Sequence, residues 1–179
     1  METAMTQTRT WNGTVKVAVC GALGALILGV AANANAGSAS TSLALSASVS
    51  NNCSISTSAV GFGSYDPVVA NASANLDGTG TVTIACTKGA TTTIGLDLGS
   101  NASGSARRLT DGSSNYLTYE LYQDSSRSTV WGNSGSGLFT PAAAPSKASR
   151  AFTAYGRVAG NQDVPAGTYT DTVTATVNF

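Results

Sequence analysis

The sequence predicts an all-β fold, an antiparallel sandwich of Greek-key type. Three observations support this prediction. After residue 38, apolar and polar residues alternate with a period of two in one run after another, and β-branched residues are abundant in these runs. Turn residues separate the runs, of which about seven follow Cys53. Beyond the first 36 residues, no segment has the apolar period of an amphipathic helix.

The first 36 residues have the layout of a secretory signal peptide, which is removed on export. Basic residues flank the start of an apolar run over 17–32, and small residues spaced Ala-x-Ala follow. The run is about 16 residues long, below the ~20 that span a bilayer, so we expect a signal peptide and not a membrane anchor. Cleavage can follow Ala34 or Ala36. We favour Ala36, which leaves a mature chain that starts at Gly37.

The first element of the mature chain is the alternating segment "SASTSLALSASVS", residues 38–50. No hairpin turn joins this segment to the next run, which leaves two interpretations. It is either a first strand within its own sheet or a strand that pairs with the sheet of a neighbouring copy. Its apolar residues are two positions apart and fall on one face, a row that Thr41 extends: Leu43, Leu45, Ala47 and Val49.

The runs that follow are predicted to be short strands bounded by turn residues. In the predicted strand 80–87, Val82, Ile84 and Cys86 share one face. Tyr119 is expected in the core, since aromatic residues at strand spacing usually serve packing. The predicted strands cover residues 60–67, 80–87, 91–99, 116–124, 129–132, 152–158 and 167–179.

Charged and polar residues do not predict a catalytic site. The mature chain carries seven Lys/Arg and eight Asp/Glu, so its net charge is −1, and no basic patch indicates nucleic acid. The chain has no histidine, and most of its aspartates occupy turn positions. We therefore expect no enzyme, no cofactor and no metal site. Arg107 and Arg108 are expected in a solvated turn, and the proline-containing segment 136–149 is expected to be a loop.

Two cysteines remain once the leader is removed, Cys53 and Cys86. An even number of cysteines in an exported chain predicts one disulfide. A redox or metal site is the weaker interpretation, because the chain has neither a Cys-x-x-Cys motif nor a histidine.

The last run, 167–179, has the clearest alternation, and the sequence ends inside it. A sandwich with the usual seven strands would place a hairpin and another strand beside it. We therefore expect an open sheet edge and a core that lacks one row of side chains. Exposed edges of this kind aggregate unless something covers them. The segment 38–50 of a neighbouring copy is the candidate that fills the gap.

Several motifs occur in order along residues 37–179: "NNCSIS", "GFGSYDP", "GTVTIACTKG", "IGLDLGSN", "ARRLTDGSSNYLTYELYQD", "WG", "YGRV" and "NQDVPAGTYTDTVTATVNF". With these motifs the chain resembles the spore coat protein U domain family, and within it the major pilins of archaic (Csu-type) chaperone–usher pili. The resemblance covers essentially the whole mature chain. It separates major pilins from minor pilins and coat proteins less well.

The resemblance implies an incomplete immunoglobulin-like fold that lacks its final strand and is completed by a donor strand from a neighbouring subunit. Residues 37–50 would be the donor extension and residues 51–179 the pilin domain. The strand 172–179 would flank the acceptor groove. The donor residues implied are Leu43, Leu45, Ala47 and Val49. The groove-edge and chaperone-contact residues implied are Val173, Ala175, Val177 and Phe179.

For function, the resemblance implies a structural subunit of a surface pilus that supports attachment and biofilm formation. Its partners would be copies of itself in a head-to-tail fibre, a periplasmic chaperone and an outer-membrane usher, with no nucleic acid and no small-molecule cofactor. The chain would pass through the periplasm to the cell surface. Two alternatives remain open: a secreted spore-coat or matrix protein of the same domain family, and a minor or tip pilin with an adhesive role.

Overall fold

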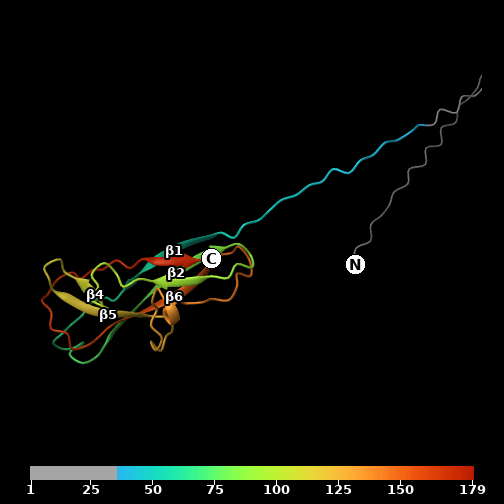
Figure 1. Ribbon diagram of the computed structural model, residues 1–179. Helices are drawn as coiled ribbons and strands as arrows, with labels where there is room; N and C mark the ends of the chain where they lie inside the picture. The colour runs from blue at the N-terminus through green and yellow to red at the C-terminus, as the bar shows by residue number, and fades with distance from the viewer. Residues whose placement is uncertain (1–35) are drawn as a thin grey trace, which may run out of the picture. The chain divides into compact units, whose positions relative to one another are not determined.

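Seven β-strands and one short 3-10 turn make up the regular structure of residues 36–179, the part of the chain that the computed structural model describes (Figure 1). The predicted signal peptide lies outside these residues, apart from its last position. No helix in the described part is long and apolar enough to cross a membrane. The elements are β1 (Cys53–Gly61), β2 (Leu76–Cys86), β3 (Thr93–Leu96), β4 (Arg107–Thr110), β5 (Tyr116–Tyr122), η1 (Gly135–Gly137), β6 (Arg150–Val158) and β7 (Ala175–Asn178).

The strands form two antiparallel sheets. The larger sheet has the order β1-β2-β6-β5-β4, and the smaller sheet pairs β3 with β7. Neighbours such as β2 and β6 are distant in sequence, so the connections cross over in the Greek-key manner. The arrangement is an immunoglobulin-like sandwich, and the predicted all-β fold class is confirmed.

Period-two alternation places the hydrophobic core between the two sheets. Along β2, Val82, Ile84 and Cys86 are buried, whereas Thr83 and Ala85 between them are only half-buried. β6 pairs with β2 in antiparallel register and shows the same alternation of buried and half-buried residues. Tyr119 is 5% exposed, so its predicted place in the core is confirmed. The core also contains Ile94, Leu96, Leu117, Leu121, Trp131, Ala154 and Val158.

Two of the predicted strands, 60–67 and 129–132, are not formed as predicted. Residues 62–67 form no strand, because β1 lies earlier and ends at Gly61. Residues 129–132 also form no strand and are joined to β5 by a single bridge between Tyr122 and Val130. The segment 136–149 contains no strand, as its prolines predicted.

The last predicted strand is regular over only four residues, Ala175–Asn178. Before it, the Thr174 N–H donates to Oδ1 of Asp97 at 2.9 Å and not to a backbone carbonyl. The same carboxylate oxygen accepts the Gly99 N–H at 2.9 Å. A side chain thus replaces a rung of the ladder, and the segment before β7 stays extended without full strand pairing.

The guanidinium of Arg107 is fully buried, so the prediction of a solvated turn is wrong for this residue. Its Nε and Nη2 donate to the carbonyl of Asp97 at 2.9 and 2.7 Å. Nη2 also donates to the carbonyls of Leu96 and Trp131 at 2.9 and 2.8 Å. Nη1 forms an ion pair with the carboxylate of Glu120. Backbone acceptors converge where β3 ends, and a planar guanidinium has enough donors to serve all of them.

Cys53 and Cys86 form the predicted disulfide, with their Cα atoms 4.1 Å apart. The bond joins the first residue of β1 to the last residue of β2. Beside it, the Thr87 N–H donates to the Asn52 carbonyl at 2.9 Å, and the Asn52 N–H donates to the Thr87 hydroxyl at 3.0 Å. This end of the β1–β2 pair is therefore held by a covalent bond and by hydrogen bonds.

Candidate functional site, a groove between two strand edges

β1 and β7 are outer strands of their sheets and lie side by side (Figure 1). β1 ends the five-stranded sheet, and β7 is one strand of the two-stranded sheet. Among residues 36–179, no strand pairs with the outer edge of either one. One side of the sandwich is therefore bordered by two strand edges that have no partner within the described chain.

Hydrogen bonds along the C-terminal segment identify its free backbone groups. The carbonyls of Thr172 and Thr174 accept from the N–H groups of Ser100 and Asp97, both at 3.1 Å. Successive residues of a strand point their N–H and C=O groups to opposite sides, so the even-numbered residues are bonded toward β3. The odd-numbered residues have half-buried side chains and turn their backbone groups to the outer edge: Asp171, Val173, Ala175 and Val177.

The edge of β1 is free in the same alternating way. Cys53 and Cys86 are a close antiparallel pair, with 4.1 Å between Cα atoms, which is the geometry of a non-hydrogen-bonded pair. Every second residue is then bonded to β2, starting with Ser54. The backbone groups of Cys53, Ile55 and Thr57 point away from β2. Both borders of the opening thus offer regularly spaced donors and acceptors to an added strand.

Two adjoining hollows lie along this side, with volumes of about 280 Å³ and about 690 Å³. The smaller lies between residues 57–60 and residues 171–173, and the larger lies between residues 60–67 and residues 164–171. We call them together the groove. The larger hollow is lined by Tyr65, Leu76, Leu117, Val158, Val164 and Tyr169, among others. The smaller hollow is lined by Val82, Leu96, Leu121, Ala154 and Val173, among others. Four residues line both hollows and mark their junction: Val60, Phe62, Leu109 and Asp171.

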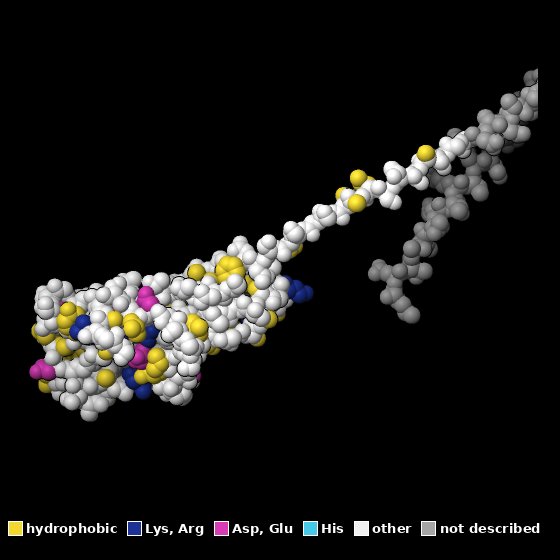
Figure 2. All heavy atoms as spheres, viewed as in Figure 1, with side chains coloured by type: hydrophobic (Ala, Val, Ile, Leu, Met, Phe, Trp, Pro, Cys, Tyr) yellow, Lys and Arg dark blue, Asp and Glu magenta, His cyan; other side chains and the backbone are white. Residues whose placement is uncertain are grey.

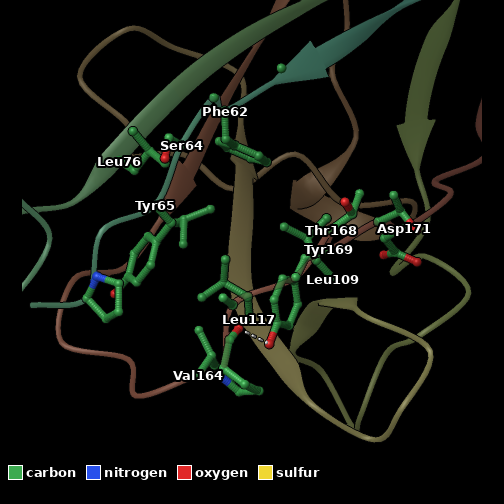
Figure 3. Close-up of a pocket in the computed structure, with 18 of the residues that line it drawn as sticks. Phe62, Ser64, Tyr65, Leu76, Leu109, Leu117, Val164, Thr168, Tyr169 and Asp171 are labelled. Carbon is green, nitrogen blue, oxygen red and sulfur yellow. Dashed lines mark hydrogen bonds between the residues drawn. The ribbon is translucent and has the colours of Figure 1, made fainter.

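The lining of the larger hollow is mainly apolar and comes from distant parts of the chain. Figure 3 shows Phe62 and Tyr65 on one side of it and Tyr169 and Asp171 on the other. The Tyr169 hydroxyl donates to the carbonyl of Pro165 at 2.9 Å, which fixes the ring in place. Core residues such as Leu117 and Val158 form the floor, so a ligand in the groove would lie against the core. Concave, mostly apolar sites with a few placed polar groups are typical binding sites.

A polar cluster stands at the junction of the two hollows, consisting of Asp171, Tyr119 and Asn101. The Tyr119 hydroxyl donates to Oδ2 of Asp171 at 2.7 Å. Oδ1 accepts the backbone N–H of Asn101 at 3.1 Å and its side-chain amide at 2.9 Å. Burial, followed by the hydrogen bond to Asp171, raises the pKa of Tyr119 well above its usual value. Both carboxylate oxygens therefore already have donors from the chain itself.

Charged residues make up 10% of the chain, so its surface has few of them to place beside the groove. Figure 2 shows few Lys, Arg, Asp or Glu side chains on the face in view. Within residues 36–179, no group of three or more His, Cys, Asp or Glu side chains could hold a metal ion. Several aspartates bond to their own turns; Oδ1 of Asp66, for example, accepts the N–H groups of Val68 and Val69 at 3.0 and 3.1 Å.

Of the four predicted groove-edge residues, only Val173 lines the groove, in its smaller hollow. Val173, Ala175 and Val177 pack against the core, whereas Phe179 follows β7 and is 55% exposed. Sequence reasoning missed Phe62 and Asp171. The aromatic residues within the glycine-rich "GFGSY" were the available signal for the first. The second, Asp171, is an acidic residue in an otherwise apolar row, and the local sequence gives no signal of its contacts.

The predicted donor residues lie in the described part of the chain before β1. Residues 36–52 form no helix or strand. The large apolar side chains in this segment are exposed, Leu43 by 82%, Leu45 by 88% and Val49 by 86%. Ala47 is exposed as well. Their pairing with another copy stays a prediction.

Comparison with known proteins identifies the family. The model of the Spore Coat Protein U domain matches residues 39–176. Protein U of Myxococcus xanthus is 43% identical over 129 residues, which are 66% of this chain and 70% of that protein. Both matches agree with the resemblance read from the motifs.

A solved structure supports the fold. It is a chain from the CsuC–CsuE chaperone–tip adhesion subunit pre-assembly complex of the archaic chaperone–usher Csu pili of Acinetobacter baumannii. The superposition has a TM-score of 0.54 at 23% identity and covers 73% of this chain. This chain spans 40% of the length of that one. The family model covers most of the sequence and Protein U agrees with it, so the chain belongs to the Spore Coat Protein U domain family.

Proposed function

We propose that this protein is a structural, non-enzymatic subunit of a surface pilus of the chaperone–usher type. Subunits polymerise by donor-strand complementation, in which residues 37–50 of one copy fill the groove of the next. The fibre serves attachment and biofilm formation. The subunit is exported through the periplasm, where a chaperone occupies the groove, and an outer-membrane usher exchanges the chaperone for the next subunit.

The observation that carries this proposal is the groove itself. It combines the unpaired strand edges of β1 and β7 with two adjoining hollows of about 690 Å³ and about 280 Å³, which lie along the same side of the sandwich and against core residues. An exposed apolar row with strand spacing lies in the same chain, at Leu43, Leu45, Ala47 and Val49. A strand added here would use backbone bonds for affinity and alternate side chains for register.

The contact would be strong and would not close on itself. Full burial of a leucine side chain contributes about 1.5–3 kcal/mol, and the donor row has two leucines as well as a valine. The donor segment and the groove are different surfaces of the same chain. A head-to-tail contact of this kind generates an open filament and not a closed dimer.

A gel of the periplasmically expressed chain tests the proposal. Samples with residues 37–49 present or deleted are compared with and without boiling. We expect a ladder that resists SDS, collapses on boiling and disappears with the deletion. A monomer in both forms would mean that the domain completes its own fold, and donor-strand assembly would be rejected.

A charge in the donor row gives a sharper test. We expect Leu45→Asp to abolish the ladder, because a buried unpaired carboxylate is costly, while the groove of the same chain still binds the chaperone. Ser46→Asp is the matched control, since its side chain belongs to the opposite face of the segment. Unchanged polymer yield from Leu45→Asp would contradict the donor assignment.

A coat protein is the second candidate, and the similarity to Protein U of Myxococcus xanthus is the observation that favours it. Such a protein would be secreted and would act in a surface layer without forming a fibre. The gel separates the two, because a coat subunit that completes its own fold gives no ladder. A minor or tip pilin would differ from a major pilin in abundance along isolated fibres.

A further inference from the structure

The polar cluster of Asp171, Tyr119 and Asn101 lies at the junction of the two hollows, in the middle of the groove. Asp171 lines both hollows, and both of its oxygens are bonded to Tyr119 and Asn101. The carboxylate occupies the space that a side chain at Gly99 would fill, because a Cβ at that position would lie 2.0 Å from Oδ2 of Asp171. The carboxylate is therefore held at one place along an otherwise apolar edge.

The opposite side of the junction is equally fixed. The ring of Phe62 packs on the ring of Tyr119, with 5.9 Å between centroids. A Cβ on Gly156 would lie 2.7 Å from the Phe62 ring, and one on Gly78 would lie 3.0 Å from it. Phe62 thus lies directly against the backbone of β2 and β6 at glycine positions, and its ring forms this side of the junction.

A strand that crosses this junction needs a small side chain there. Both oxygens of Asp171 already have donors from the cluster, and a bulky side chain would displace the carboxylate from these bonds. The donor row has one small member, Ala47, between Leu45 and Val49. We propose that the cluster of Asp171, Tyr119 and Asn101 sets the register of the donor strand by accepting only Ala47 beside it. This inference rests on the proposed function.

The two hollows then receive the large neighbours of Ala47. Residues two positions apart on a strand are about 6.6–6.8 Å apart, so Leu45 and Val49 fall on opposite sides of the junction. A shift by two residues would place a branched side chain against Asp171. A shift by one residue would turn the serine face of the donor into the core, because a one-residue slip reverses every side chain. The polar cluster therefore disfavours donor registers that are shifted by one or two residues in either direction.

Cross-linking of the assembled fibre tests the register. Thr172→Cys is placed next to Asp171 on the exposed face and is combined with one cysteine at a time on the outer face of the donor, at Ser42, Ala44, Ser46, Ser48 or Ser50. Ala47 beside Asp171 puts Ser46 opposite Thr172 in an antiparallel donor and Ser48 in a parallel one. Thr170→Cys, on the other side of Asp171, is tested with the same donor set to fix the strand direction. We expect ladders that survive boiling without reductant from the pairs 172–46 and 170–48, or from the pairs 172–48 and 170–46. A dominant cross-link from position 42, 44 or 50 would overturn the proposal.

Side-chain size gives an independent readout. Ala47→Leu is expected to reduce the boiling-sensitive ladder to the level of the 37–49 deletion, while Ala44→Leu on the outer face leaves it unchanged. A full ladder from Ala47→Leu would show that the junction does not select for size. The proposed function fails separately, since the unsubstituted chain would then give no ladder at all.

Discussion

Arg107→Lys is expected to destabilise the domain strongly, although it keeps the charge. The Arg107 guanidinium is fully buried and donates to three carbonyls, those of Leu96, Asp97 and Trp131, at 2.7–2.9 Å. It also pairs with Glu120. A lysine ammonium is a compact point charge with three donors and cannot reproduce this planar arrangement.

The magnitude follows from the acceptors that lose their donor. Each buried polar group left without a partner costs about 1–3 kcal/mol. The lysine would keep some of the bonds, and the Glu120 side chain is 28% exposed, so water replaces part of its lost pairing. We expect the free energy of unfolding to fall by about 2–4 kcal/mol. With an m-value of about 1.5 kcal/mol/M, the urea midpoint would fall by roughly 1.3–2.7 M.

Urea unfolding of the mature chain measures this loss. A chain that starts at Gly37 contains a single tryptophan, the fully buried Trp131, whose fluorescence reports on the same part of the core. Arg108→Lys is the matched control on the same strand. Its guanidinium stacks over the ring of Tyr116 at 3.9 Å, a partly exposed contact worth about 0.5–1 kcal/mol. Equal midpoints for the two variants would refute the structural role of Arg107.

Three further predictions concern stability. Cys53→Ser is expected to lower the free energy of unfolding by about 4 kcal/mol, as loop-closure entropy predicts for a separation of 33 residues; a urea midpoint equal to that of the oxidised chain would contradict it. Gly99→Ala is expected to destabilise the domain more than Gly89→Ala. Both positions have positive φ (+83° and +86°), but only at Gly99 would the new Cβ meet a neighbour, the side chain of Asp171. Thermal melts of the two variants measure the difference. Acidification is expected to destabilise the fold, because hydrogen bonds lower the pKa of turn aspartates in the folded state. Their contribution to stability is full above about pH 4 and is lost as the pH falls through the lowered pKa values. A urea midpoint that is constant from pH 7 to pH 2 would exclude this prediction. The carboxyl groups concerned are those of Asp66, Asp111 and Asp124.

The strands with one buried face could be predicted from the sequence because their pattern is local. Val82, Ile84 and Cys86 alternate with Thr81, Thr83 and Ala85. The structure buries the apolar row Val82, Ile84 and Cys86 as expected. The disulfide could be predicted from the cysteine count in an exported chain. The row Val173, Ala175 and Val177 could also be predicted, since half-buried and exposed residues alternate there.

Features that depend on distant parts of the chain could not be predicted. The burial of Arg107 is set by carbonyls at the end of β3 and at Trp131, and no local pattern indicates that these groups converge. The role of Asp171 depends on Tyr119 and Asn101, which are 52 and 70 residues away in sequence. In the strand pattern alone, an arginine beside a second arginine suggests solvent, and an aspartate in an apolar row suggests no particular contact.

The disulfide also decides how the domain responds to a pull on its N-terminal segment. Only Ser50, Asn51 and Asn52 separate the alternating row from Cys53, so the tether is short, roughly 10 Å when fully extended. Tension that reaches Cys53 passes through the sulfur atoms to Cys86 at the end of β2, an inner strand of the five-stranded sheet. β1 would otherwise peel from the sheet one residue pair at a time, starting at this end. Because the disulfide locks the first residue pair of β1 and β2, β1 carries little of the force. The groove border that β1 forms therefore keeps its shape under tension.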